Sequence, residues 1–298
     1  MKKNKAIGLL IVGLIYLLTI GIGVGIYFIL PPVIKEQALL TMLIIDVVCT
    51  VVIYLFSTIF KNSSIYDPYW SVAPMVIYSA YMVITETINP YTIIFLLVVA
   101  FWSIRLTTNW AIRFKNLSVQ DWRYQNFKDK HPKVYFLINL FGIHLFPTIM
   151  VFVGMLPGFF FIEKTVTTQL NFSFLLSCLV MIFATIFEMI ADTQMAKFKK
   201  DPSNKGKVMA RGLWKNSRHP NYLGEILFWV GIWLTYFGAE TDFMRAMITS
   251  TSPILIFCMF VFISIPMLEK RQLKNKIAYK EYMECSNMLL PFPTKSKK

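Results

Sequence analysis

The sequence has little that could hold a metal ion or a disulfide framework. Its cysteines form no CxxC pair and show no metal-ligand spacing, and three of the four fall in apolar segments. The three histidines are scattered along the chain. We therefore expect no metal site. We also expect the cysteines to be small buried thiols and not to form disulfides. The four cysteines are Cys49, Cys178, Cys258 and Cys285.

Nucleotide-binding signatures of soluble proteins are also missing. No GxGxxG stretch follows an expected strand, and no Walker sequence is present. A soluble-type dinucleotide fold is therefore not supported. Any nucleotide site must be built by the helices and loops of the chain itself.

Acidic residues are few, because 16 Asp and Glu face 30 Lys and Arg and leave a formal net charge of +14. The cations lie in loops between apolar segments rather than in one basic domain. In such a chain they indicate orientation in a membrane and attraction to anionic lipid. We expect membrane lipids and no nucleic acid among the partners, and the sequence points to no protein partner.

Long apolar segments dominate what is present: 56% of the residues are hydrophobic and the mean hydropathy is +0.56. Each segment is near the ~20 residues that span a bilayer. Backbone groups in lipid must bond within their own segment, so the segments must be helices. We predict an all-α polytopic membrane bundle with about eight transmembrane helices. The expected segments are 7–30, 38–60, 70–85, 91–112, 134–157, 169–191, 222–238 and 247–266.

The cations also predict the orientation. With the N-terminus in the cytoplasm, the cytoplasmic parts hold 26 of the 30 Lys and Arg, and the opposite loops hold only Lys35, Lys164 and Arg245. The positive-inside rule then puts both termini in the cytoplasm. We expect a multi-pass protein of the inner membrane if the chain is bacterial, or of the endoplasmic reticulum if it is eukaryotic.

The most informative stretch runs from Arg218 to Glu225, where a basic loop enters an apolar helix. Asn221 and Glu225 are four residues apart and share one helix face. Glu225 should lie about one turn inside the membrane, where an ionisable residue indicates a functional site by default.

Two further polar stripes are expected at the same cytoplasmic half of the membrane. Together they suit a phosphate-bearing, adenine-containing cofactor, with cations on the phosphates and Asp or Asn on the ribose hydroxyls. The alternative is that these groups pair with one another inside the bundle and that the basic loops only anchor it. The stripes are Arg105, Asn109 and Arg113, and Glu188, Asp192 and Lys199; Trp122, Tyr124 or Trp214 could stack on a ring.

Asp67 opens the third expected segment, directly before Pro68. One interpretation is a helix N-cap beside an interfacial aromatic belt. The other is a carboxyl group at the mouth of an apolar cavity, where desolvation raises its pKa and lets it donate a proton.

The residues resemble a family at this point. The stretch from Gly212 to Glu225 resembles the signature of the steroid 5α-reductase superfamily, and the chain is most similar to its uncharacterised, mostly microbial branch. Asp-Pro-Tyr-Trp at 67–70, Asp-Trp-Arg-Tyr at 121–124 and the tail from Glu269 also fit that branch. The resemblance implies a seven-helix core over residues 38–293, preceded by an added helix in residues 1–37 and followed by a basic tail at 294–298.

The resemblance implies a membrane reductase that uses NADPH on a double bond conjugated to a carbonyl group. Asp67 stands where the family has its catalytic glutamate. Trp102 falls near the family's catalytic tyrosine, so Tyr66, Tyr69 or Tyr78 would supply the phenol, and we take Tyr69. Lys199 and Lys207 stand where the family has arginine. The cofactor-binding residues implied are Arg113, Arg123, Tyr124, Asp192, Lys199, Lys207, Arg218, His219, Asn221, Tyr222 and Glu225.

Two alternatives stay open. Isoprenylcysteine carboxyl and phospholipid methyltransferases share an Arg-His-Pro-x-Tyr-x-Gly stretch and a late acidic-basic segment, here 218–224 and 269–271. That resemblance implies S-adenosylmethionine in place of NADPH. A transporter or non-catalytic membrane protein is the second alternative, with Asp46, Arg105 and His144 as an ion path.

Overall fold

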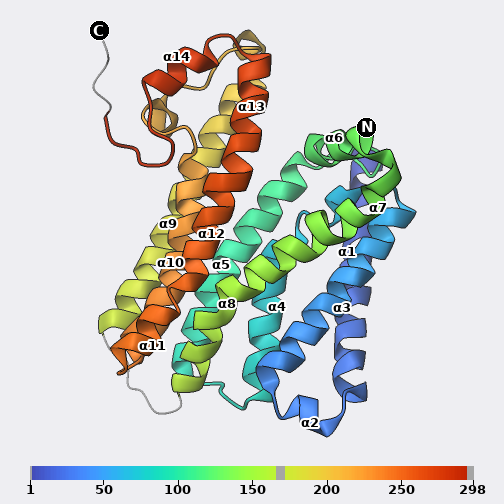
Figure 1. Cartoon of the computed structure of the whole chain (residues 1–298), viewed down its shortest axis with the longest axis vertical. Coiled ribbons are helices and arrows are strands. Elements are labelled where there is room, and N and C mark those ends of the chain that lie inside the picture. Colours follow the sequence, from blue (N-terminus) through green and yellow to red (C-terminus); the bar gives the residue numbers. More distant parts are fainter. Residues whose placement is uncertain (1, 166–171, 294–298) are drawn as a thin grey trace. The chain divides into compact units, whose positions relative to one another are not determined.

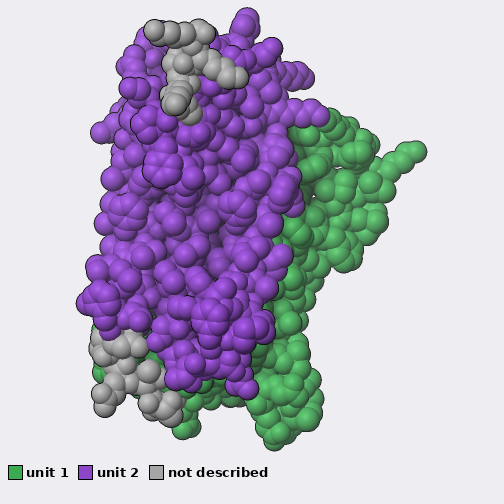
Figure 2. All heavy atoms as spheres, turned by 60° about the vertical axis from the view of Figure 1, so that its left-hand side comes forward, with its two compact units in different colours: residues 1–167 green, residues 168–298 purple. Residues whose placement is uncertain are grey.

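The computed structural model of the chain describes residues 2–165 and 172–293. The expected basic tail at 294–298 and the first residues of the segment expected at 169–191 lie outside this range. The chain forms two compact units, residues 1–167 and 168–298, which Figure 2 shows in different colours. Over the described range the chain is mainly helical and contains no β-strand.

Seven helical stretches of the described residues are long and apolar enough to cross a membrane. The expected segment 70–85 is also a helix, α4 (Tyr69–Ile84), but its 16 residues fall short of the ~20 that a bilayer needs. The multi-pass all-α membrane fold is therefore confirmed, with seven full-length spans where we expected about eight. The spans are Asn4–Ile29, Ala38–Ile59, Pro90–Arg113, Pro132–Lys164, Phe172–Lys200, Pro220–Ala239 and Phe243–Asn275.

Unit 1 is a bundle in which α3 packs against α1 and α4 packs against α5 and α8, as Figure 1 shows. The hydroxyl of Tyr16 on α1 donates to the carbonyl of Ile65, 2.9 Å away, and ties the first helix to the turn before α4. The helices are α1 (Lys2–Ile29), α2 (Pro32–Lys35), α3 (Ala38–Ile59), α4, α5 (Pro90–Arg113), α6 (Trp122–Lys130), α7 (Tyr135–Leu137) and α8 (Phe146–Lys164).

The stretch between α7 and α8 has a wider backbone than an α-helix. Residues Ile138–Leu145 form a π-helix, η3, that runs without a break from α7 into α8. Such turns are rare and occur frequently at functional sites. This one carries Asn139 and His144, which are both buried.

Unit 2 is built on a close pair of helices, α9 and α10. Gly224, Gly231 and Gly238 of α10 are seven residues apart and all face α9. A Cβ atom on Gly224 would lie 2.7 Å from Cβ of Glu188, and one on Gly231 would lie 2.4 Å from Cγ of Met181. Small residues of this kind let helix backbones approach closely in a membrane. The helices are α9 (Phe172–Lys200), α10 (Pro220–Ala239), α11 (Phe243–Ile248), α12 (Thr251–Met259), α13 (Ile265–Asn275) and α14 (Tyr279–Glu284).

Candidate functional site

Unit 1 brings together two motifs that are far apart in the sequence. The phenol of Tyr124 on α6 donates to Oδ1 of Asp67, 2.6 Å away. Asp67 follows the short 3₁₀ turn η1 (Ser63–Ile65) and is half-buried, as is Tyr124. A carboxyl and a phenol, each able to donate or accept a proton, thus lie side by side with partial access to solvent.

The loop before α6 explains how Tyr124 is placed. Asp121 caps the helix, and its Oδ1 accepts from the backbone N–H of Arg123 at 2.9 Å and from Nε of Arg123 at 2.8 Å. The backbone N–H of Asp121 in turn donates to Oγ of Ser64, 2.8 Å away. The helix start and the turn before Asp67 are therefore fastened to each other.

The surroundings of Asp67 favour the neutral form of its carboxyl group more than water does. Burial raises the pKa of Asp67 from 3.8 to about 6, while the charge of Arg123 and the hydrogen bond from Tyr124 act in the opposite direction. Burial, and then the negative charge of Asp67, raises the pKa of Tyr124. The Arg123 guanidinium lies 5.4 Å from the centre of the Tyr124 ring, and it is also paired with Asp121 at 2.8 Å.

Tyr69, the expected catalytic phenol, points elsewhere. Its hydroxyl donates to Oδ1 of Asp46, 2.7 Å away, and its ring stacks on Tyr66 with 5.5 Å between centres. A catalytic role for Tyr69 stays a prediction. The phenol that lies on Asp67 is that of Tyr124, which the sequence had suggested for the cofactor.

Arg113 lies at the exposed end of α5, where Nε donates to the carbonyl of Asn109 at 3.3 Å. Arg105, on the same stripe two turns earlier, is buried. This stripe belongs to unit 1, and those of α9 and α10 belong to unit 2. Their expected convergence stays a prediction.

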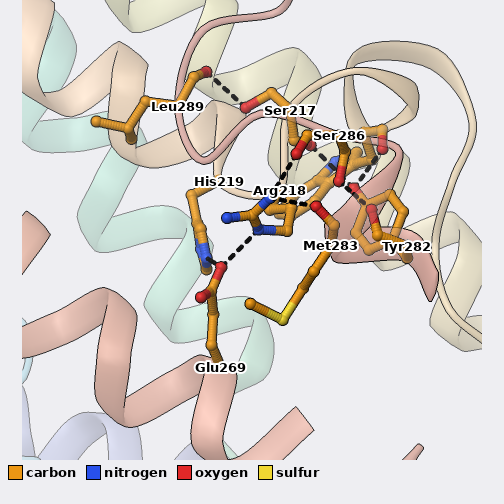
Figure 3. A network of polar contacts seen from close by, with 9 residues as sticks. Ser217, Arg218, His219, Glu269, Tyr282, Met283, Ser286 and Leu289 are labelled. Carbon is orange, nitrogen blue, oxygen red and sulfur yellow. Dashed lines mark hydrogen bonds and ion pairs between the residues drawn. The ribbon is translucent and has the colours of Figure 1, made fainter. Parts of the chain in front are cut away.

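Unit 2 holds a second polar cluster, centred on Glu269 of α13 (Figure 3). Oε1 of Glu269 accepts from Nε of Arg218 at 2.7 Å and lies 3.1 Å from Nε2 of His219. The Arg218 and Glu269 side chains are only 11% and 13% exposed. An ion pair this little exposed is strongly coupled, because loss of one partner leaves the other charge poorly solvated.

The same cluster fixes the C-terminal strap, which we define as residues 286–293. The backbone N–H groups of Arg218 and His219 donate to the carbonyls of Asn287 and Met288 at 2.9 and 3.1 Å. The hydroxyl of Ser217 donates to the carbonyl of Leu289 at 2.6 Å. Figure 3 also shows the Arg218 guanidinium directed at the carbonyls of Met283 and Ser286. Arg218 therefore anchors the strap.

The start of α10 carries the remaining residues of the motif. His219 stacks on Tyr222 with 5.4 Å between ring centres and 8° between the planes, and Asn221 is half-buried beside them in the chain. Glu225 is buried, and its Oε1 accepts from the indole N–H of Trp229 at 2.9 Å. The ionisable group expected inside the membrane is thus present and held by its own helix.

The C-terminal end of α9 and the loop after it are rich in cations. Asp192 is half-buried, whereas Lys199 and Lys207 are exposed. Burial, and then the positive charge of Lys199, lowers the pKa of Lys276 just beyond α13. The two ammonium groups are therefore close enough for their charges to interact. Trp214, one of the expected stacking rings, is instead buried with its indole N–H on the carbonyl of Ala191 at 2.9 Å.

An apolar groove of about 610 Å³ lies beside the Glu269 cluster. Leu223 and Ile226 of α10, Phe257 of α12 and strap residues between Asn287 and Pro293 line it. Its volume falls in the range of roughly 300–1,000 Å³ that is usual for ligand pockets.

Comparison with known proteins now gives the family. Residues 53–286 match the family described as "Protein of unknown function (DUF1295)". The chain belongs to this family. A relative from Schizosaccharomyces pombe (strain 972 / ATCC 24843), "Uncharacterized protein C594.04c", is 28% identical over 158 residues, which cover 46% of this chain and 45% of that protein. The chain thus matches less than half of the length of this relative. No solved structure matches the chain.

The DUF1295 match covers every residue that the sequence had suggested for the site, from Asp67 to Glu225, and also Glu269. The sequence named Glu269 only as part of an acidic-basic segment, and its contacts with Arg218 and His219 appear only in the fold. One feature of the sequence could have suggested these contacts. Glu269 is an acidic residue next to an apolar segment, and acidic residues that become buried are almost always paired with a basic group.

Proposed function

We propose that this DUF1295 chain is an integral membrane oxidoreductase that uses NADPH to reduce a carbon–carbon double bond conjugated to a carbonyl group in a lipid or steroid-like molecule. The observation that carries the proposal is the 2.6 Å hydrogen bond between Tyr124 and Asp67. It joins the Asp-Pro-Tyr-Trp and Asp-Trp-Arg-Tyr motifs, the two stretches that resemble the uncharacterised branch of the steroid 5α-reductase superfamily.

The pair suits this chemistry because negative charge develops on the carbonyl oxygen when such a double bond is reduced. Donors aimed at that oxygen in a partly desolvated site stabilise the charge. With a pKa of about 6, Asp67 can hold or release a proton near neutral pH. Tyr124 takes the phenol role that we had given to Tyr69, because the Tyr69 hydroxyl is bonded to Asp46.

In this proposal, residues of unit 2 hold the cofactor. When bound, NADPH supplies the hydride. Lys199, Lys207 and Lys276 would hold its phosphates as point charges, and the repulsion between Lys199 and Lys276 favours an anion there. Asp192 and Asn221 would accept or donate to ribose hydroxyls. Arg218 and His219 would act indirectly, by fixing the strap and the start of α10.

The proposed substrate class follows from the groove and the membrane setting. Apolar side chains of two membrane-spanning helices form the wall of the groove. A molecule with a long hydrocarbon chain could bury that chain in the groove, and the buried chain would give up no hydrogen bonds to water. The groove supports a lipid substrate over a small polar one.

The test is thermal unfolding of the purified protein in detergent with NADPH, NADH or S-adenosylmethionine. A ligand that binds only the folded protein stabilises it by about 2.7 kcal/mol at 100 times its Kd. We expect stabilisation by NADPH, reduced in Lys199→Gln and Lys207→Gln and retained in Lys35→Gln, the matched control on the opposite side of the predicted topology. Stabilisation by S-adenosylmethionine alone would exclude the reductase.

A second candidate, an S-adenosylmethionine-dependent methyltransferase, is favoured by one specific contact. Arg218 and His219 belong to the stretch shared with methyltransferases, Glu269 belongs to the shared acidic-basic segment, and all three side chains meet. For this function we expect S-adenosylmethionine to raise the unfolding temperature in the wild type and not in Glu269→Gln. Loss of the NADPH effect in the same variant would instead assign the cluster to the reductase.

A further inference from the structure

Buried polar groups of unit 1 form a continuous line that the proposed reaction does not use. Oδ1 of Asp46 accepts from the hydroxyl of Tyr69 at 2.7 Å, and Thr50 lies near that hydroxyl. The hydroxyls of Thr50 and Thr148 are 2.8 Å apart. The hydroxyl of Tyr66 lies 2.9 Å from that of Thr148. One carboxyl and four hydroxyls therefore follow one another, with hydrogen bonds from Asp46 to Tyr69 and from Thr50 through Thr148 to Tyr66.

The line is shielded from water. None of its five side chains is more than 6% exposed. Every hydroxyl can donate one hydrogen bond and accept another, so the direction of the whole line can reverse. Hydrogen bonds in a low-dielectric interior also polarise one another. These are the properties that a path for protons requires.

His144 lies at the far end of this line. Its Nδ1 is 2.7 Å from the carbonyl of Asn139. Because a carbonyl only accepts, Nδ1 carries the hydrogen, and Nε2 of the neutral ring is left as an acceptor. Nε2 is fully buried and has no hydrogen-bond partner among the described residues. The ring lies against Tyr66, with 4.7 Å between centres.

A purely structural role leaves this nitrogen unexplained. A buried acceptor without a donor carries the full cost of its desolvation, and His144 lies on the π-helix η3, itself a rare backbone form. The groups that face the two ends include Cys49 and Tyr69 around Asp46, and Tyr54 and Tyr66 around His144. Cys49 is itself bonded to the carbonyl of Thr19.

We propose that Asp46 and His144 are the two ends of a buried proton-transfer path through Tyr69, Thr50, Thr148 and Tyr66. One small proton donor, a water molecule, binds at Nε2 of His144 and joins the ring to the hydroxyl of Tyr66. When the Asp46 carboxyl releases its proton to Tyr69, each hydroxyl passes on its own proton. Nε2 of His144 receives the last one. The products are a carboxylate and an imidazolium, and no electron moves.

The use of this path rests on the proposed function, although the path itself does not. Reduction of a double bond takes up one proton with each hydride, whereas methyl transfer to a carboxylate takes up none. Tyr66, the last hydroxyl before His144, is the neighbour of Asp67 in the chain, so the path passes the segment that carries the proposed acid. A proton store with this placement serves a reductase.

The path is tested without substrate or cofactor, so its failure is distinct from a failure of the reductase proposal. Infrared spectroscopy in D₂O follows the band of the protonated Asp46 carboxyl, which Asp46→Asn assigns by removing it. Thr148→Val keeps the shape and removes the hydroxyl, and Thr148→Ser keeps the hydroxyl. We expect Thr148→Val to slow deuterium exchange of the band by about five- to tenfold, since one lost hydrogen bond adds about 1–1.4 kcal/mol to the barrier.

Thr148→Ser should exchange like the wild type. So should Tyr78→Phe, which removes a buried phenol of α4 that donates to the carbonyl of Met155 and not to a member of the line. If Thr148→Val does not fold, Tyr69→Phe interrupts the same line at another point. Equal exchange rates in wild type and in the interrupted variant, or no protonated Asp46 band at any pH, would overturn the proposal.

Nitrogen NMR of the three histidines tests the other end. With ¹⁵N-labelled histidine, His144→Gln assigns the His144 signals. We expect the hydrogen of the neutral His144 ring on Nδ1 and a hydrogen-bonded Nε2. The ¹⁵N chemical shift of Nε2 should change in Tyr66→Phe and remain unchanged in Tyr78→Phe. A proton on Nε2 of the neutral ring, or an Nε2 shift typical of a free acceptor, contradicts the bound water.

Discussion

Tyr124 donates its phenolic proton to Asp67, 2.6 Å away and 57 residues earlier in the chain. The contact ties the start of α6 to the turn before α4. It also makes the ionisation of Asp67 a property of both segments, because loss of the Asp67 proton is opposed by burial and helped by Arg123 and Tyr124.

The raised pKa of Asp67 predicts how stability depends on pH. The folded protein binds this proton more tightly than the unfolded chain, so stability falls as pH rises from 3.8 through about 6. Asp67→Asn removes the ionisation and should flatten this part of the curve, with a gain in unfolding temperature above the pKa. Thermal unfolding of both proteins across this range checks it. A wild-type curve that rises over the same interval contradicts the assignment.

Tyr124→Phe should raise the pKa of Asp67 further, because the phenol donates to the carboxylate and so favours its charged form. The measurement is the pH midpoint of the Asp67-dependent stability change. Tyr135→Phe is the matched control, since the Tyr135 hydroxyl bonds to Oγ of Ser63 at 2.8 Å and not to Asp67. The idea fails if both variants shift the midpoint equally.

Glu269→Ala should lower the free energy of unfolding by about 3 kcal/mol, because it leaves Arg218 without its carboxylate in a little-exposed site. Arg245→Ala is the control: the Arg245 side chain is 72% exposed and lies 3.5 Å from Asp242, and exposed pairs contribute about 0–1 kcal/mol. Chemical denaturation of both variants gives the comparison. Similar losses would mean that the Glu269 cluster is no stronger than a surface pair.

Gly231→Leu should separate α9 from α10 and destabilise unit 2 by about 1–3 kcal/mol, because even a Cβ would lie 2.4 Å from Met181 Cγ and 3.2 Å from its backbone nitrogen. Gly25→Leu on α1 is the control, since nothing lies within 4 Å of its added Cβ. Unfolding in detergent should distinguish them. Equal stability of the two variants would show that the glycine spacing on α10 has no packing role.

The helices and their membrane character could be predicted from the sequence, because twenty apolar residues in lipid leave the backbone one choice. Residue type and place in the chain were also enough to select Asp67, Tyr124 and Arg218 as candidate site residues. Their partners could not. Whether Tyr69 or Tyr124 reaches Asp67 depends on the loop that Asp121 and Ser64 fasten together, and no local pattern encodes a contact over 57 residues.

The glycines of α10 also show that the sequence does not identify which segments contact each other. Their spacing of seven residues is visible in the sequence, yet it predicts a close helix partner only when the partner is known to be α9. Glu269 was visible as a lone acid among cations, and the fold decides that Arg218 and His219 share it.

The pairing of residues 216–219 with the strap has a consequence for synthesis. Arg218 and the start of α10 leave the ribosome well before the carbonyls of Ser286, Asn287 and Met288 that complete their bonding. During that interval the start of α10 lacks its hydrogen bonds to the strap. The helices α9 and α10 can therefore insert as a pair before Glu269 reaches Arg218 and His219. Binding of the strap then completes the hydrogen bonds at the start of α10.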